Sequence, residues 1–343
     1  MKNFYNNSVA VSIVESPKPI LWLDTHIVIR MTKAKLGERI GDDLKRYLSF
    51  YEKIFSLVCD GRIICPIAEQ GEEISHGRSL EKPCYELQLA LSRGVQFRHG
   101  EEIRSIQRKK AMLCFLHREK EICLSYVDCF DEDPCTEVQK TLGFIIGVYG
   151  KQGNQVLNKE IETKKRMVEV CNSLKKFINN SGIKYHEQFE REQKGLLQAL
   201  MQIIDDWRRI YAKHLEPTLS DVEHYLLLSR LLSEWEQCGG EAGDIAGLIT
   251  FLASDEYKIL PHVDISSMLW AKLLVNSGDV ASGDSMDIYQ LSTVIPFCKY
   301  VISDRKMRNI LHELGVDNKY NTSIYCMHDY KKLIEELNRF EKA

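Results

Sequence analysis

The sequence predicts an α/β protein whose parallel sheet is interrupted by a large all-helical insertion. Near both ends of the chain, short apolar runs alternate with amphipathic helical patterns, which is typical of a parallel sheet with crossover helices. Between them, residues 101–254 consist of long amphipathic stretches with almost no proline. We therefore expect a core built from residues 18–100 and 255–343, with residues 101–254 as the helical insertion.

The first part of the core is expected to contain two strands. Short apolar runs predict them, and apolar residues at helical spacing, followed by stops at Gly61 and Gly94, predict the helices. In chain order the expected elements are a strand at 20–24, a helix at 42–61, a strand at 62–66, a turn into a helix at 67–74 and a helix at 85–94.

The middle of the chain is expected to be helical throughout. Its apolar runs at 196–204 and 224–235 are too long for exposed faces, so they should pack on the core, on each other or on a second copy of the chain. Trp207 beside two arginines could stack on a nucleic-acid base, but acidic residues are nearly as frequent, and a solvated face with ion pairs is the simpler interpretation. The expected helices cover residues 101–122, 158–180, 185–215 and 220–237.

The last part of the core returns to alternating elements. A helix at 265–278 ends at a glycine, and the next helix begins with Ser282 or Asp284 as its N-cap. In chain order, the remaining expected elements are a strand at 299–303, a helix at 305–315, a strand at 322–327 and a closing helix at 329–343.

Composition narrows the class of protein. The chain has 343 residues and a formal net charge of −3, which argues against a whole-surface nucleic-acid binder. No apolar run approaches the roughly 18 residues of a membrane span, and the start of the chain lacks a secretory signal. Its 11 cysteines form no CxxC pair, and the spacing around 114–135 fits no zinc finger. We expect a cytoplasmic protein with reduced thiols, no membrane segment and no nucleotide or dinucleotide cofactor.

Acidic residues recur where the expected strands end and the following helices begin. In a parallel sheet these positions share one edge, and ligands bind there. The candidates are Asp24 after the first strand, Glu72 after the second (with Glu69 and Glu73 as alternatives), Asp284 and Asp287 at a helix start, and Asp304 after the strand at 299–303.

Such a cluster of carboxylates predicts a divalent cation. Neighbouring carboxylates repel one another unless a positive charge compensates them. Oxygen ligands without Cys or His suit Mg²⁺ or Mn²⁺, which can activate water and neutralise a phosphoryl group. The predicted chemistry is phosphodiester hydrolysis. The alternative for Asp24, Asp284, Asp287 or Asp304 is a helix cap or an ordinary helix start.

Four segments together resemble one known family. They are ILWLDTHIVIR at 20–30, RIICPIAEQGEEI at 62–74, GDSMDIYQLSTVIPFCKYVISDRKMRNIL at 283–311 and TSIYCMHDYKKLIEEL at 322–337. In this order they resemble the PIN-like nuclease superfamily: a strand ending in Asp-Thr, a proline before a helix-borne Glu, paired aspartates on a helix, and a strand ending in Ser-Asp. Counting from the proline favours Glu72. The resemblance covers residues 18–100 and 255–343.

The resemblance implies a PIN-like three-layer fold with a central parallel sheet. It also implies a metal-dependent endoribonuclease, such as a toxin or defence effector, that leaves a 3′-hydroxyl and a 5′-phosphate and prefers RNA to DNA. The ligands of Mg²⁺ or Mn²⁺ would be the five acids Asp24, Glu72, Asp284, Asp287 and Asp304, with Thr25 and Ser303 supporting them through hydrogen bonds.

Two residues depart from the family pattern. His26 stands where the family often has Asn or a small residue, and Lys299 replaces a frequent Asp, which could place a cation near the site.

Two other functions stay open. The alternatives are an inactive PIN-like module that binds RNA or a protein partner, and a structure-specific DNA nuclease. The helical insertion could also mediate a homo-oligomer or a partner contact.

Overall fold

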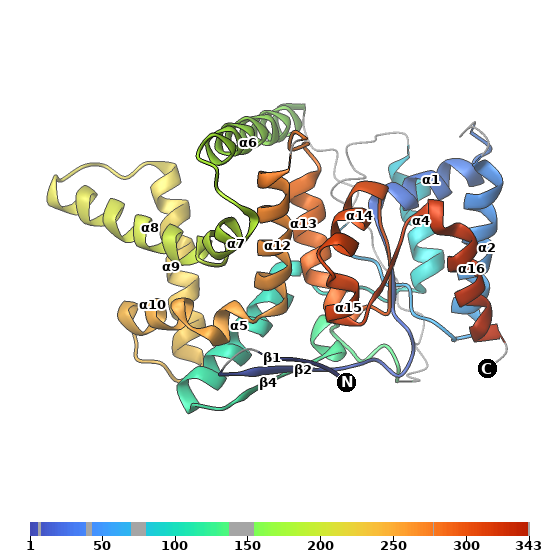
Figure 1. The fold of residues 1–343 in the computed structure, drawn as a ribbon, viewed down its shortest axis with the longest axis horizontal. Coiled ribbons are helices and arrows are strands. Elements are labelled where there is room, and N and C mark those ends of the chain that lie inside the picture. Colours follow the sequence, from blue (N-terminus) through green and yellow to red (C-terminus); the bar gives the residue numbers. More distant parts are fainter. Residues whose placement is uncertain (6–7, 39–42, 70–79, 137–153, 277, 342–343) are drawn as a thin grey trace.

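The protein is a mixture of helices and two small sheets (Figure 1). The computed structural model describes residues 1–5, 8–38, 43–69, 80–136, 154–276 and 278–341. The α/β class expected from the sequence is confirmed. Among the described residues, no helix has both the length and the apolar character needed to cross a membrane.

The central sheet is parallel and has the strand order β3-β5-β6, formed by β3 (Leu21–Leu23), β5 (Tyr300–Ile302) and β6 (Ser323–Tyr325). On the other side of β3, a parallel bridge joins Ile20 to Ile64, and a further bridge joins Ile67 to Gln96. The chain therefore places the segment after β3 on one side of that strand and β5 on the other. This reversal is a topological switch point, where open α/β sheets bind ligands at the carboxyl ends of their strands.

Side chains alternate between the two faces of the central sheet, and each face is covered by helices. Trp22, Val301 and Ile324 face one core, while Leu23, Ile302 and Tyr325 lie in the other. The helices of the first core include α12 (Pro261–Val275), α13 (Asp284–Val294), α14 (Arg305–Glu313) and α15 (Val316–Tyr320); those of the second are α1 (Thr25–Lys35), α2 (Leu44–Cys59), α4 (Glu81–Ser92) and α16 (Tyr330–Asn338).

The second sheet was not expected. β1 (Lys2–Tyr5) pairs antiparallel with β2 (Ala10–Val14), and β2 pairs in parallel with β4 (Glu121–Ser125). The prediction of an all-helical stretch at 101–254 is therefore wrong at β4. Helix α5 (Gly100–His117) ends because Arg118 adopts a left-handed conformation with φ 54°, and burial then alternates along β4 with the period of a strand.

The remaining helices of residues 101–254 pack on the core and on each other. Leu200, Trp235 and Phe251 belong to the same hydrophobic cluster as Trp22 of the central sheet. The expected packing of these helices on the core and on each other is thus observed. These helices are α6 (Asn154–Asn180), α7 (Tyr185–Gln193), α8 (Gly195–Ala212), α9 (Leu219–Gln237) and α10 (Ile245–Ala253). The structure also contains the short helix α11 (Asp255–Lys258) and the 3₁₀ turns η2 (Tyr126–Cys129), η3 (Ile295–Phe297), η4 (Met327–Asp329) and η5 (Arg339–Glu341).

A buried histidine joins α5 to α12. The Nδ1 of His262 lies 2.9 Å from the Gln107 side-chain oxygen, which also accepts the His262 backbone N–H at 3.3 Å. Burial, assisted by the charges of Arg104 and Arg108, lowers the pKa of His262 well below its usual 6.5. The folded protein therefore holds this imidazole neutral.

We expect His262 to make the fold acid-sensitive. Below pH 6.5 the unfolded chain gains a proton at this residue that the folded chain does not, so stability falls as the pH drops. Between pH 7 and about pH 5 the loss should reach about 2 kcal/mol. Urea unfolding of wild type and His262→Gln at both pH values measures it: the variant should lose less stability on acidification, and equal losses would contradict the assignment.

Candidate functional site

Asp24 occupies the carboxyl end of β3 and has two roles there. Its backbone N–H donates to the Ile302 carbonyl at 2.9 Å, which extends the pairing of β3 with β5. Its Oδ1 accepts the His26 backbone N–H at 2.8 Å and caps α1. Its Oδ2 accepts the hydroxyl of Ser303 at 3.2 Å. The buried carboxylate is therefore a helix cap and is also bonded to the end of the neighbouring strand.

Ser303 and Asp304 follow β5 directly. Ser303 is fully buried, and its backbone N–H donates to the Tyr325 carbonyl at 2.9 Å. Asp304 caps α14, because its Oδ1 accepts the backbone N–H groups of Lys306 at 2.5 Å and Met307 at 3.2 Å. The structure thus brings two predicted acids and one predicted supporting residue to adjacent strand ends at the switch point.

His26 lies within electrostatic range of this edge. Burial and the charge of Arg30 lower the pKa of its imidazole, while the charge of Asp304 partly opposes them. At neutral pH His26 is therefore an uncharged neighbour of the carboxylates, and it does not neutralise them.

Asp284 is linked to the same edge by an ion pair with Lys306. The carboxylate is almost fully buried, and both of its oxygens lie 2.6 Å from the Nζ of Lys306. The N-cap expected at Ser282 or Asp284 is wrong, since Gly283 is the cap and Asp284 is the first helical residue. The Asp284 carboxylate instead turns back to accept the Ala281 backbone N–H at 2.8 Å, which keeps it beside the start of α13.

The other predicted residues have different outcomes. Asp287 lies in the first turn of α13, at the helix start that was expected, and its side chain is half-buried. Thr25 is buried, but the hydrogen bond expected from its hydroxyl to the acids is not formed, because the hydroxyl has no partner within the described parts of the chain. Glu72 and Glu73 lie outside the described residues, so their place at the site stays a prediction.

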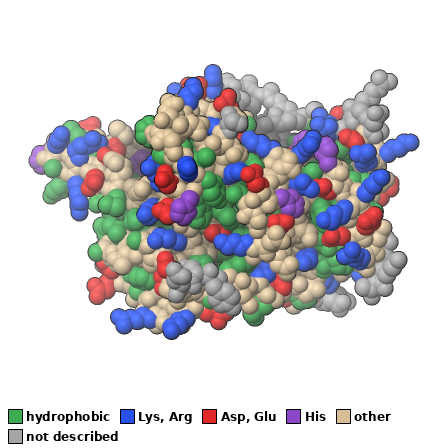
Figure 2. All heavy atoms as spheres, in the orientation of Figure 1, with side chains coloured by type: hydrophobic (Ala, Val, Ile, Leu, Met, Phe, Trp, Pro, Cys, Tyr) green, Lys and Arg blue, Asp and Glu red, His purple; other side chains and the backbone are tan. Residues whose placement is uncertain are grey.

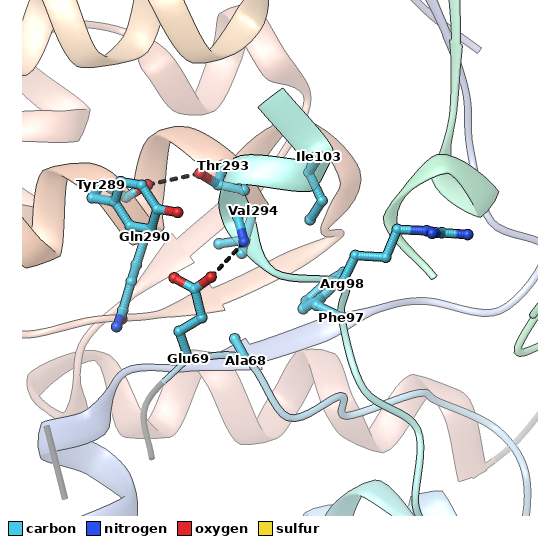
Figure 3. A pocket seen from close by; sticks show the side chains of 10 residues that line it. Ala68, Glu69, Phe97, Arg98, Ile103, Tyr289, Gln290, Thr293 and Val294 are labelled. Atoms are coloured by element: carbon cyan, nitrogen blue, oxygen red, sulfur yellow. Dashed lines mark hydrogen bonds between the residues drawn. The ribbon is translucent and has the colours of Figure 1, made fainter. Parts of the chain in front are cut away.

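Glu69, the third acid of that group, serves a different helix. Its Oε1 accepts the Gly100 backbone N–H at 2.5 Å and lies 3.0 Å from the Nε2 of His99. Glu69 therefore holds the start of α5 and lines a small cavity of about 10 Å³ beside Phe97 and Tyr289 (Figure 3). Burial raises the pKa of the Tyr289 phenol, and the negative charge of Glu69 raises it further.

The cation near the acids is Lys306, which the sequence analysis missed. Lys299, suggested for this role, directly precedes β5, and its backbone N–H donates to the Ile20 carbonyl at 2.9 Å, at the end of the strand opposite to Ser303. That suggestion is wrong. One feature of the sequence could have indicated Lys306. A lysine in the first turn of a helix is unfavourable beside the positive end of the helix dipole, so a nearby anion is expected to compensate it.

The donor atoms suit a hard cation. Asp24, Asp284 and Asp304 supply carboxylate oxygens, and the unpartnered hydroxyl of Thr25 adds a neutral one, which is the chemistry that Mg²⁺ and Mn²⁺ prefer. Within the described ranges, no three Asp, Glu, His or Cys side chains are grouped closely enough to hold a metal. The ammonium of Lys306 already compensates one of the carboxylates.

We expect Lys306→Met to destabilise the protein by about 1–2 kcal/mol in EDTA, since the buried Asp284 loses its cation while Lys306 itself is partly exposed. The double variant Lys306→Met/Asp284→Asn should recover most of this loss, and Mn²⁺ should restore part of it in the single variant. Urea unfolding measures the stability of the single variant in EDTA, of the single variant with Mn²⁺ and of the double variant. A single variant as stable as wild type in EDTA would contradict this account of the pair.

Comparisons with known proteins give no further assignment: no family model matches the chain, and no significant match was found among curated proteins or solved structures.

Proposed function

We propose that the protein is a metal-dependent endoribonuclease whose site is the carboxyl edge of the central sheet. One observation carries this proposal: Asp24 and Ser303 end neighbouring parallel strands at the switch point and are bonded at 3.2 Å, with Asp304 next in the chain. Mg²⁺ or Mn²⁺ would be held by Asp24, Asp284, Asp287, Asp304 and the predicted Glu72.

Each described residue has a definable part in this proposal. A bound ion supplies positive charge against the phosphoryl oxygens and a lowered pKa for water. Ser303 fixes the orientation of the Asp24 carboxylate through its hydroxyl. The positive amino ends of α1 and α14 also lie at this edge, where Asp24 and Asp304 already accept backbone N–H groups of the two helices. Lys306, partly exposed, is a cation that a substrate phosphate can share with Asp284.

The preference for RNA over DNA, and a role as a toxin or defence effector, come from the resemblance to PIN-like nucleases. A structure-specific DNA nuclease would use the same acids, so the substrate has to be decided by experiment. The chemistry at phosphorus is common to both.

A second candidate is a catalytically inactive PIN-like module that binds RNA or a protein. The specific observation in its favour is the pair between Lys306 and Asp284, which satisfies one carboxylate without a metal. In that case the lysine would be a permanent replacement for the ion.

Cleavage of end-labelled single-stranded RNA, single-stranded DNA and a flapped DNA duplex separates these functions. Each substrate is incubated with Mg²⁺, Mn²⁺ or EDTA. The proposal predicts RNA cleavage that requires metal and leaves a 5′-phosphate. Cleavage of only the flapped duplex would identify a DNA nuclease, and intact substrates in all conditions would favour the binding module.

A further inference from the structure

Helix α6 is attached to the segment that carries Asp284. The side chain of Lys175 is buried, and its Nζ donates to the Leu273 carbonyl in the last turn of α12 at 2.5 Å. Asn172 bonds both backbone groups of Val280, accepting its N–H at 2.9 Å and donating to its carbonyl at 3.2 Å. Val280 lies four residues before Asp284, so these bonds fix α6 beside the start of α13 (Figure 1).

The charges around Lys175 agree with this placement. Burial lowers the pKa of its amine, Asp279 and Asp284 oppose that shift, and Lys306 adds to it. The helix is thus within electrostatic range of the candidate site.

The outward side of α6 carries an apolar stripe. Met167, Val170, Leu174 and Phe177 are spaced by three and four residues, which places them on one face of a helix, and their side chains are 39% to 66% exposed. Phe177, at 60%, is a large aromatic ring in water. Exposure of this kind marks a binding surface more often than a free one.

Cations lie on the adjoining flank of the same helix. At about 100° per residue, Arg166 is in line with Phe177 three turns earlier, and Lys165 and Lys176 lie about 100–120° further round the helix. Lys165, Arg166 and Lys176 are exposed, against the acids Glu162 and Glu169, and Arg166 is paired with Glu162 at 2.9 Å. Figure 2 shows Lys and Arg side chains along the upper edge of the molecule, where α6 lies. This excess of cations belongs to a chain whose net charge is −3.

We propose that α6 binds the single-stranded RNA that the neighbouring edge cleaves, with Phe177 stacking on a base and Lys165, Arg166 and Lys176 facing phosphates. The inference rests on the proposed nuclease function for its choice of ligand. A site rich in carboxylates repels a polyanion, so the substrate needs cations close to it. An aromatic ring beside basic residues is the arrangement that holds single strands without sequence preference.

The test measures binding without cleavage. Fluorescence anisotropy follows a fluorescein-labelled oligouridylate with the Asp24→Asn protein in EDTA, over a range of KCl concentrations. Adding Phe177→Ala should weaken binding roughly tenfold. Adding Lys176→Glu should weaken it and make it less dependent on salt, because a phosphate contact is lost. Both residues are exposed, and circular dichroism checks that the variants fold.

A matched control is Tyr211→Ala on α8. Tyr211 is also an exposed aromatic residue close to arginines, Arg208 and Arg209, but on another helix. Its substitution should leave binding unchanged. Equal binding by wild-type and α6-substituted proteins would overturn the inference, as would α6-dependent binding to phosphatidylserine vesicles without RNA binding.

The two proposals can fail separately. RNA binding that depends on Phe177, in a protein that cleaves nothing in Mn²⁺, would overturn the nuclease and keep the α6 surface. Metal-dependent cleavage that is unaffected by Phe177→Ala and Lys176→Glu would keep the nuclease and overturn the α6 surface.

Discussion

Substitution of Asp24 by Asn should reduce metal-dependent RNA cleavage by more than about 100-fold. Groups that only orient a metal ligand already contribute about 10- to 100-fold, and Asp24 is proposed to be a ligand. The fold should survive, because Asn is as good an N-cap as Asp. Its side-chain oxygen can still accept the His26 N–H, and the Ser303 hydroxyl can accept from its amide. The substitution therefore removes the charge and keeps the cap.

The matched control is Asp244→Asn. Asp244 is also an N-cap, and its carboxylate accepts the Gly247 backbone N–H at 2.8 Å, but it begins α10, on the far side of the molecule from α1 (Figure 1). This variant should cleave RNA like wild type, with both rates measured on the same labelled strand. If Asp24→Asn also retained full activity, the cleavage would come from a different site.

The second large effect concerns stability: Arg108→Met should lower the free energy of unfolding by about 3–5 kcal/mol. Arg108 on α5 donates to both oxygens of Glu234 on α9 at 2.9 Å, and both side chains are 5% exposed. Arg108 also bonds Glu101 at 2.9 Å. Without the guanidinium, the buried Glu234 carboxylate would keep the hydroxyl of Ser105 as a hydrogen-bond partner and the charge of Arg230 nearby. Urea unfolding measures the loss.

The double variant Arg108→Met/Glu234→Met separates loss of a partner from loss of packing. Replacing both members of a buried pair by apolar residues is often nearly neutral, so this variant should recover most of the stability. Equal damage in the single and double variants would show that packing, and not the orphaned charge, is responsible.

The same pair predicts a dependence on pH. Burial alone raises the pKa of the Glu234 carboxyl, but the hydrogen bonds and charge of Arg108 hold it below its usual 4.5. The pair therefore stabilises the fold above pH 4.5 and loses this contribution as the pH falls through the lowered pKa. In the double variant this part of the acid sensitivity should be absent.

Local patterns in the sequence predicted much of the central sheet. The runs that became β3 and β5 are wholly buried, and each ends at an Asp that caps the next helix. A strand that ends in a capping residue is a local signal, so Asp24 and Asp304 could be placed without knowledge of the fold. The expected strand at 62–66 contributes one bridged residue, Ile64.

Contacts between distant segments were beyond the reach of such patterns. β4 pairs with β2, about a third of the chain away, and its first two residues, Glu121 and Ile122, were expected to end a helix. Lys306 could not be linked to Asp284 from spacing alone, because the helices α13 and α14 approach each other only in the folded protein. Lys299 was suggested because it stands where the resembled family often has Asp, but β5 separates it from Asp304.

Titration calorimetry with Mn²⁺ is the decisive test of the proposed metal site at the edge of the central sheet. We expect wild type to bind Mn²⁺, Asp24→Asn to lose this binding, and Asp244→Asn to retain it. Absence of Mn²⁺ binding by the wild type, or unchanged binding by Asp24→Asn, would contradict the claim that the carboxylates at the edge of the central sheet hold a catalytic ion.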